Sequence, residues 1–140
     1  MMDYTYKFYE YLPEAARLIR TEVFVEEQGF ANEFDDTDES CLHTVLWAGN
    51  EPAAVGRLID CGDGVYAIGR VAVRKQFRGT GLGTEVMGVL ENKARESGGK
   101  KVWVSAQCRA AKFYQGCGYT ASGETYFDEH VEHIHMEKLL

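Results

Sequence analysis

The chain has 140 residues, of which 45% are hydrophobic and 26% are charged, and its formal net charge at pH 7 is -7. This length and composition are typical of one globular domain, which we expect to span residues 1–140. The negative charge argues against nucleic acid as the main partner, because phosphate backbones bind basic surfaces. No apolar run approaches the ~20 residues of a membrane span, and residues 1–6 lack the pattern of a signal peptide. We therefore expect a cytoplasmic protein.

Apolar periodicity and turn residues predict the secondary structure in chain order. Pro13 suits the first turn of a helix, and Gly29 is expected to end that helix. Gly62-Asp63-Gly64 is a strong hairpin turn, and Gly98-Gly99 ends a second helix with an apolar stripe. The predicted order is strand 3–11, helix 13–28, strands 42–48, 53–61 and 65–73, helix 80–97, strand 101–106, helix 109–115 and a final β-hairpin.

The four cysteines stand at positions 41, 61, 108 and 117. None forms a C-x-x-C pair, and no histidine lies at zinc-ligand spacing from two of them. We therefore predict no metal site and expect reduced thiols. The acidic run Glu33–Glu39 lies in a predicted loop, and we expect it to be solvated, since runs of charge usually face water.

Three alternating glycines, Gly79, Gly81 and Gly83, lie where the fourth predicted strand runs into the second predicted helix. Glycine lets backbone N–H groups approach a ligand without an intervening Cβ. The N-terminus of a helix offers unpaired donors and a partial positive charge, which bind phosphate. Arg74 and Lys75 add positive charge nearby. The segment therefore predicts a phosphate-bearing ligand held mostly by the backbone.

The spacing of these glycines excludes two common phosphate-binding designs. A P-loop requires G-x-x-x-x-G-K-[ST], and no such sequence is present here. A dinucleotide-binding fold requires G-x-G-x-x-G and an acidic residue about 20 positions later, whereas this chain has G-x-G-x-G and then Val104-Ser105-Ala106. A nicotinamide-dependent oxidoreductase is therefore disfavoured.

Two motifs resemble the GNAT superfamily of acetyl-CoA-dependent N-acetyltransferases. The segment from Arg78 to Gly83 has the family's R-x-x-G-x-G pattern. The segment from Ala111 to Tyr119 resembles its A-x-x-F-Y-x-x-x-G-[FY] pattern, with Ala110 or Ala111 as the small residue. The resemblance implies an α+β fold with a twisted mixed sheet of about six to seven strands flanked by helices. It also implies acetyl-CoA as the co-substrate and an amine as the acceptor.

The resemblance assigns residues to coenzyme binding. In the family, the glycine turn cradles the pyrophosphate, and the preceding strand splays from its neighbour so that the pantetheine arm pairs with its free edge. Tyr114 matches the tyrosine that protonates the departing thiolate. The coenzyme-binding positions implied here are Val71, Ala72, Val73, Arg78, Gly79, Thr80, Gly81, Leu82, Gly83 and Thr84.

The general base is not assigned by these motifs. Many family members carry a glutamate in the strand before the glycine turn, but residues 66–73 contain no carboxylate, and Arg70 stands there. Residues 23–29, residues 35–38 with His43, and residues 131–136 resemble a little-characterised bacterial subgroup of predicted N-acetyltransferases. This narrower resemblance leaves Glu27, His43 and His133 as candidates. Each also has a structural interpretation: a polar helix end for Glu27, and a hydrogen-bonding role for either histidine.

The predicted function is transfer of an acetyl group to a primary amine of a small molecule. The alternative is a non-catalytic coenzyme A-binding or sensing module, in which the missing strand carboxylate reflects lost chemistry. Arg57 and Arg70 could bind an anionic group of the acceptor or pair with acidic residues. A homodimer is compatible with the resemblance, because family members often pair through sheet edges or the terminal hairpin.

Overall fold

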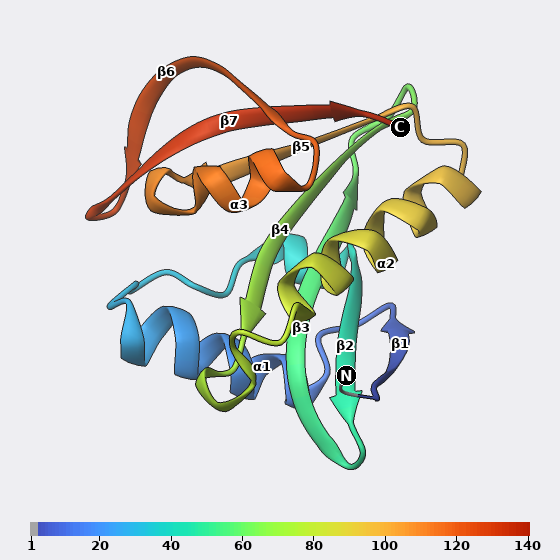
Figure 1. Cartoon of the computed structure of the whole chain (residues 1–140), viewed down its shortest axis with the longest axis vertical. Helices are drawn as coiled ribbons and strands as arrows, with labels where there is room; N and C mark the ends of the chain where they lie inside the picture. The colour runs from blue at the N-terminus through green and yellow to red at the C-terminus, as the bar shows by residue number, and fades with distance from the viewer. Residues whose placement is uncertain (1–2) are drawn as a thin grey trace.

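The computed structural model describes residues 3–140. Its helices and strands follow the predicted order, with an added π-helical turn (η1) and three 3₁₀ turns (Figure 1). In chain order they are β1 (Thr5–Tyr9), α1 (Glu14–Arg20), η1 (Thr21–Glu27), η2 (Asp36–Glu39), β2 (Leu42–Ala48), β3 (Glu51–Asp60), β4 (Val65–Val73), η3 (Lys75–Phe77), α2 (Leu82–Glu96), β5 (Lys101–Gln107), η4 (Cys108–Ala110), α3 (Ala111–Gly116), β6 (Thr120–Asp128) and β7 (Val131–Leu139).

The strands form one seven-stranded sheet in the order β1-β2-β3-β4-β5-β7-β6. Every neighbouring pair is antiparallel except β4 and β5, which are parallel. This mixed sheet, with its flanking helices, confirms the predicted α+β class and strand number. The crossover between the two parallel strands is made by α2, as the geometry of parallel pairing requires.

Apolar side chains cover both faces of this sheet. On one face, α2 buries the stripe predicted from its sequence, with Val86, Leu90 and Ala94 fully enclosed against the sheet. On the other face, α1 and η1 bury Ile19 and Phe24 in a second cluster. The result is a three-layer arrangement with the sheet in the middle.

The two parallel strands separate along their length. Pairing between β4 and β5 is confined to residues 65–67 and 101–103, although both strands continue well beyond. Figure 1 shows β4 diverging from β5 and β7. A register shift against β3 marks a bulge in β4, where Arg70 adopts a left-handed φ of 53°. The sheet therefore opens at the carboxyl ends of these strands, as the resemblance implies.

Glycines end the helices where the sequence predicts. Gly29 and Gly98 have φ values of 78° and 86°, a left-handed conformation that glycine adopts without steric cost. The predicted helix 13–28 is one continuous segment whose second half is the π-helical turn η1. Among residues 3–140, no helix has both the length and the apolar character needed to cross a bilayer.

Candidate active site

The glycine turn presents a row of free amides. Gly79 and Gly81 have φ values of 79° and 83°, and α2 begins directly after Gly81 without a side-chain cap. The backbone N–H groups of residues 79–84 donate to no acceptor within the described part of the chain. A Cβ on Gly83 would lie only 3.2 Å from the Phe113 ring, so the missing side chain also lets α3 approach closely. Six unpaired donors at a helix N-terminus form a ready site for an anion.

The side chain of Arg78 lies at this turn but is engaged by the protein. Its Nε donates to the carbonyl of Val73 at 2.9 Å, and its two terminal nitrogens donate to Glu27 at 2.8 and 2.9 Å. This contact lowers the pKa of the Glu27 carboxyl. Glu27 therefore anchors the end of η1 to the glycine turn, and it does not line the cleft that holds Tyr114. Its position does not support its role as the base.

The free edge of β4 leads from this turn toward the opening in the sheet. Beyond residue 67, the edge of β4 that faces β5 has no strand partner. Val73 borders the glycine turn, whereas Val71 lines the opening between the strands. Ala72 is buried against α1. The backbone of residues 71–73 is therefore placed to pair with an extended ligand that runs from one site to the other.

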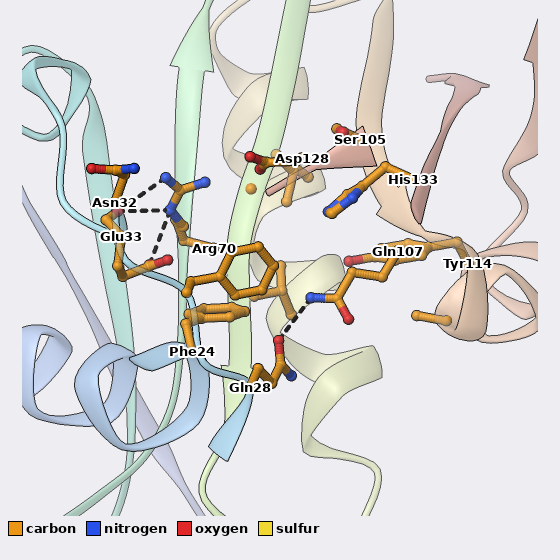
Figure 2. Close-up of a pocket in the computed structure, with 15 residues that line it drawn as sticks. Phe24, Gln28, Asn32, Glu33, Arg70, Ser105, Gln107, Tyr114, Asp128 and His133 are labelled. Atoms are coloured by element: carbon orange, nitrogen blue, oxygen red, sulfur yellow. Dashed lines mark hydrogen bonds and ion pairs between the residues drawn. The ribbon is translucent and has the colours of Figure 1, made fainter. Parts of the chain in front are cut away.

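A cleft of about 190 Å³ occupies the space where β4 and β5 separate (Figure 2). The sequence-predicted residues Tyr114 and His133 both line it, one from α3 and the other from β7. Two glutamines that the sequence analysis did not select also face it, and Gln107 donates to the side chain of Gln28 at 2.8 Å. Asp128 adds a carboxylate from the end of β6.

Tyr114 points its hydroxyl into the cleft. Its ring packs edge-to-face against Phe113 and Tyr119, with centroid distances of 5.0 and 5.9 Å. The hydroxyl forms no hydrogen bond to residues 3–140. Burial, with a smaller contribution from Cys117, raises the pKa of Tyr114 to about 12. The phenol is therefore protonated near neutral pH and can donate a proton.

His133 is nearly buried, and its orientation is fixed by the backbone. Its Nδ1 lies 2.9 Å from the carbonyl oxygen of Val131, which can only accept a hydrogen bond. The neutral ring therefore carries its hydrogen on Nδ1, and the Nε2 lone pair is left without a partner among the described residues. The ring stacks on Tyr126, with a centroid distance of 6.0 Å and an interplanar angle of 23°.

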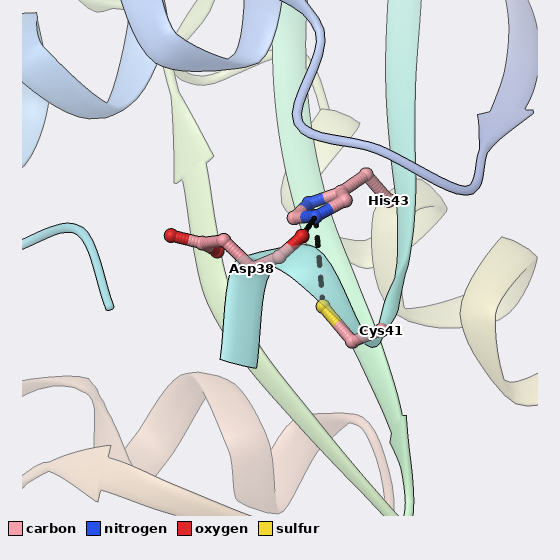
Figure 3. Close-up of side chains that lie close together, drawn as sticks. All are labelled: Asp38, Cys41 and His43. Carbon is pink, nitrogen blue, oxygen red and sulfur yellow. Dashed lines mark hydrogen bonds between the residues drawn. The ribbon is translucent and has the colours of Figure 1, made fainter. Parts of the chain in front are cut away.

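His43 lies outside this cleft. It is 1% exposed, and its Nε2 donates to the backbone carbonyl of Asp38 at 2.9 Å, with the Cys41 sulfur 3.5 Å away (Figure 3). Burial lowers the pKa of His43. The structure therefore corrects the placement expected for His43 and favours its hydrogen-bonding interpretation.

Asp38, Cys41 and His43 offer three potential ligand atoms within 4.8 Å of one another. The carboxylate of Asp38 is nevertheless already hydrogen-bonded to Arg20 and Arg57. A metal ion would have to displace two buried guanidinium groups, which makes this cluster a poor donor set.

The expectation that the acidic run 33–39 is solvated is wrong for two of its members. Glu33 and Asp38 are 5% and 4% exposed. Arg20 contacts Glu33 at 2.9 Å and Asp38 at 2.7 Å, and Arg57 contacts Asp38 at 2.9 Å. Arg70 contacts Glu33 at 3.0 Å, so this arginine and Arg57 both pair with acids. The network fixes the loop against the sheet.

Glu33 also lines the cleft, although its place in an acidic run predicted only a solvated side chain. Burial raises the pKa of Glu33, against the opposing charges of Arg70 and Arg20. A signal was available, because Arg20 falls on the apolar stripe of the first helix, and a buried arginine requires an acidic partner.

Comparisons with known proteins agree with this geometry. The sequence model of a family described as "Acetyltransferase (GNAT) domain" matches residues 9–140. YjcF of Bacillus subtilis (strain 168), named as an uncharacterized N-acetyltransferase, is 33% identical over 123 residues, covering 86% of this chain and 87% of that protein. YyaT of the same strain is 34% identical over 125 residues, covering 86% and 84%.

Solved structures share the fold over almost the whole chain. An acyl-CoA N-acyltransferase from Pseudomonas aeruginosa is 31% identical, with a TM-score of 0.83 and 99% of each chain covered. A Bacillus subtilis acetyltransferase in complex with CoA has the same fold at 16% identity, with a TM-score of 0.74 and 99% of each chain covered. This chain therefore belongs to the GNAT family of acetyltransferases.

Proposed function

We propose that the protein is an N-acetyltransferase that moves the acetyl group of acetyl-CoA to a primary amine of a small molecule. The observation that carries this proposal is the row of unpaired amides at residues 79–84, continuous with the open edge of β4 that leads to Tyr114. The relative YjcF is named an N-acetyltransferase, which supports the amine as acceptor class. The modest volume of the cleft favours a small acceptor.

Acyl transfer to an amine requires three things of the protein. The amine must lose a proton, the thioester oxygen needs a hydrogen-bond donor, and the departing thiolate needs a proton. In our proposal, Nε2 of His133 accepts the proton of the attacking amine, a backbone N–H of β4 donates to the oxygen, and Tyr114 protonates the thiolate. The C–N bond forms and the C–S bond breaks. His133 gains one proton from the amine, and Tyr114 gives one proton to the thiolate.

If His133 is the base, its replacement should lower catalytic activity. His133→Asn retains a donor for the Val131 carbonyl but removes the lone pair at the Nε2 position, so kcat/KM should fall by about 10²- to 10⁴-fold. His135→Asn, on the same strand but outside the cleft, is the control and should retain activity. Equal rates in the two variants would exclude His133 as the base.

The role of the glycine turn predicts a change in coenzyme binding. Gly81→Ala places a Cβ at a left-handed φ, which costs about 1–2 kcal/mol, and displaces the adjacent amides. We expect coenzyme A affinity to fall at least about 10-fold, measured by calorimetry. Gly49→Ala, in the β2–β3 turn, has a comparable left-handed φ and open surroundings, so it should bind coenzyme A normally.

The reaction itself is tested by an acceptor screen that detects released thiol. Coenzyme A should first raise the melting temperature, because a ligand that binds only the native state stabilises it by about 2.7 kcal/mol at 100 times its Kd. Thiol release that depends on a primary amine would support the enzyme. Coenzyme binding without thiol release across a broad amine panel would instead favour a binding or sensing module.

A further inference from the structure

The β6–β7 turn reaches across the cleft to the segment that follows η1. The carboxylate of Glu129 accepts hydrogen bonds from the backbone N–H groups of Ala31 and Asn32 at 2.8 and 2.9 Å. Nε2 of His130 donates to the carbonyl of Gln28 at 2.6 Å, and its ring lies 5.3 Å from that of Phe30. Three hydrogen bonds and a ring contact therefore fasten the turn to residues 28–32.

These contacts lie at the border of the cleft that Tyr114 and His133 line, where we place the acceptor amine. Gln28, Phe30 and Asn32 line it from one side, and Asp128, next to Glu129, lines it from the other. The β6–β7 hairpin is otherwise joined to the sheet through the pairing of β7 with β5, beyond the opening between β4 and β5. The fastened turn, residues 128–130, is thus a strap that bridges the two sides of the opening.

The backbone of the strap is held in a conformation that is unfavourable for glutamate. Glu129 has a left-handed φ of 53° in a two-residue hairpin connection, where glycine or asparagine is the usual residue. A non-glycine residue in this conformation carries a conformational cost, and such positions concentrate at ligand-binding and switch regions. The two backbone hydrogen bonds also lower the pKa of Glu129, so its carboxylate stays ionised near neutral pH.

We propose that Glu129 determines acceptor size: by fastening the strap, it confines the cleft to small amines and excludes the lysine side chains of peptides. This inference rests on the proposed function, since it concerns the acceptor of that reaction. The carboxylate acts on the acceptor through the position of the turn, so Glu129 is a specificity-determining residue without a role in the chemical step.

The test compares Glu129→Gly with wild type. Glycine relieves the left-handed conformation, which offsets part of the stability lost with the two hydrogen bonds of the carboxylate, so the variant should still fold. The acceptors are linear and branched primary alkylamines of increasing size and a ten-residue peptide with one lysine, assayed by thiol release. We expect the ratio of kcat/KM for the largest acceptors to that for the smallest to rise at least about 10-fold. Glu124→Ala, an exposed change on β6 of the same hairpin, is the control and should keep the wild-type ratio.

A second measurement reports whether the hydrogen bonds of Glu129 hold the strap in place. Amide hydrogen exchange at Ala31 and Asn32 should accelerate at least about 10-fold in Glu129→Gly and stay unchanged in Glu124→Ala. Unchanged exchange would contradict the strap. Faster exchange with an unaltered size ratio would overturn its role in specificity. If no amine supports thiol release by the wild type, the proposed function fails, whatever the exchange data show.

Discussion

Replacing Tyr114 with phenylalanine should lower kcat by about 10²- to 10⁴-fold and leave the Kd of coenzyme A nearly unchanged. The hydroxyl faces the cleft and has no hydrogen-bond partner among residues 3–140, while the ring packs against its neighbours. Phenylalanine therefore preserves the packing and removes only the proton donor. Kinetics of thiol release and calorimetry with coenzyme A measure the two quantities separately.

The raised pKa of Tyr114 is compatible with this role. Burial raises it to about 12, so the phenol keeps its proton near neutral pH until a thiolate forms beside it. Tyr119→Phe is the control: its hydroxyl donates to buried Glu91 at 2.8 Å, so this change should reduce stability by about 1–3 kcal/mol and leave kcat unaffected. Wild-type turnover in Tyr114→Phe would exclude the acid role.

Replacing Asp38 with asparagine should lower the free energy of unfolding by about 3 kcal/mol. Asp38 is the shared partner of Arg20 and Arg57, whose side chains are 1% and 7% exposed. Without the negative charge of Asp38, the buried guanidinium groups of Arg20 and Arg57 have fewer opposing charges. Urea denaturation measures the change. Asp36→Ala, an exposed change in the same η2 turn, should have an effect below about 0.5 kcal/mol.

The same network predicts how stability depends on pH. Burial alone would raise the pKa of Asp38, but Arg20 and Arg57 lower it from 3.8 to about 2. A depressed carboxyl pKa contributes stability that is complete above the unfolded pKa and is lost as pH falls toward the folded value. The wild type should therefore lose about 2 kcal/mol between pH ~4 and ~2 through this group. Parallel acid dependence in Asp38→Asn would contradict this assignment.

Local sequence signals predicted the order of the strands and α-helices, and the bounds of β2 and β4 coincide with the predicted 42–48 and 65–73. These features depend on alternation, apolar stripes and glycines that act within a few residues. The glycine turn was predictable for the same reason, since its φ values and free amides are set by a short segment.

Features that depend on distant partners were not predictable in this way. The burial of Glu33 and Asp38 is set by arginines on α1, β3 and β4, and a run of acids alone predicts a solvated loop. His43 and His133 were indistinguishable in sequence, yet only His133 lines the cleft, because its strand lies across the opening from β4. The strap at Glu129 joins segments about 100 residues apart, so no local pattern indicates it.

The proposed function requires the backbone amides of residues 79–84 to hold the diphosphate of coenzyme A. The most direct test is an NMR titration of the ¹⁵N-labelled protein with coenzyme A, following each backbone amide. We expect large, saturable downfield shifts of the amide protons of Gly79, Gly81 and Gly83. Saturable binding that leaves these amides unmoved and shifts others instead would contradict it.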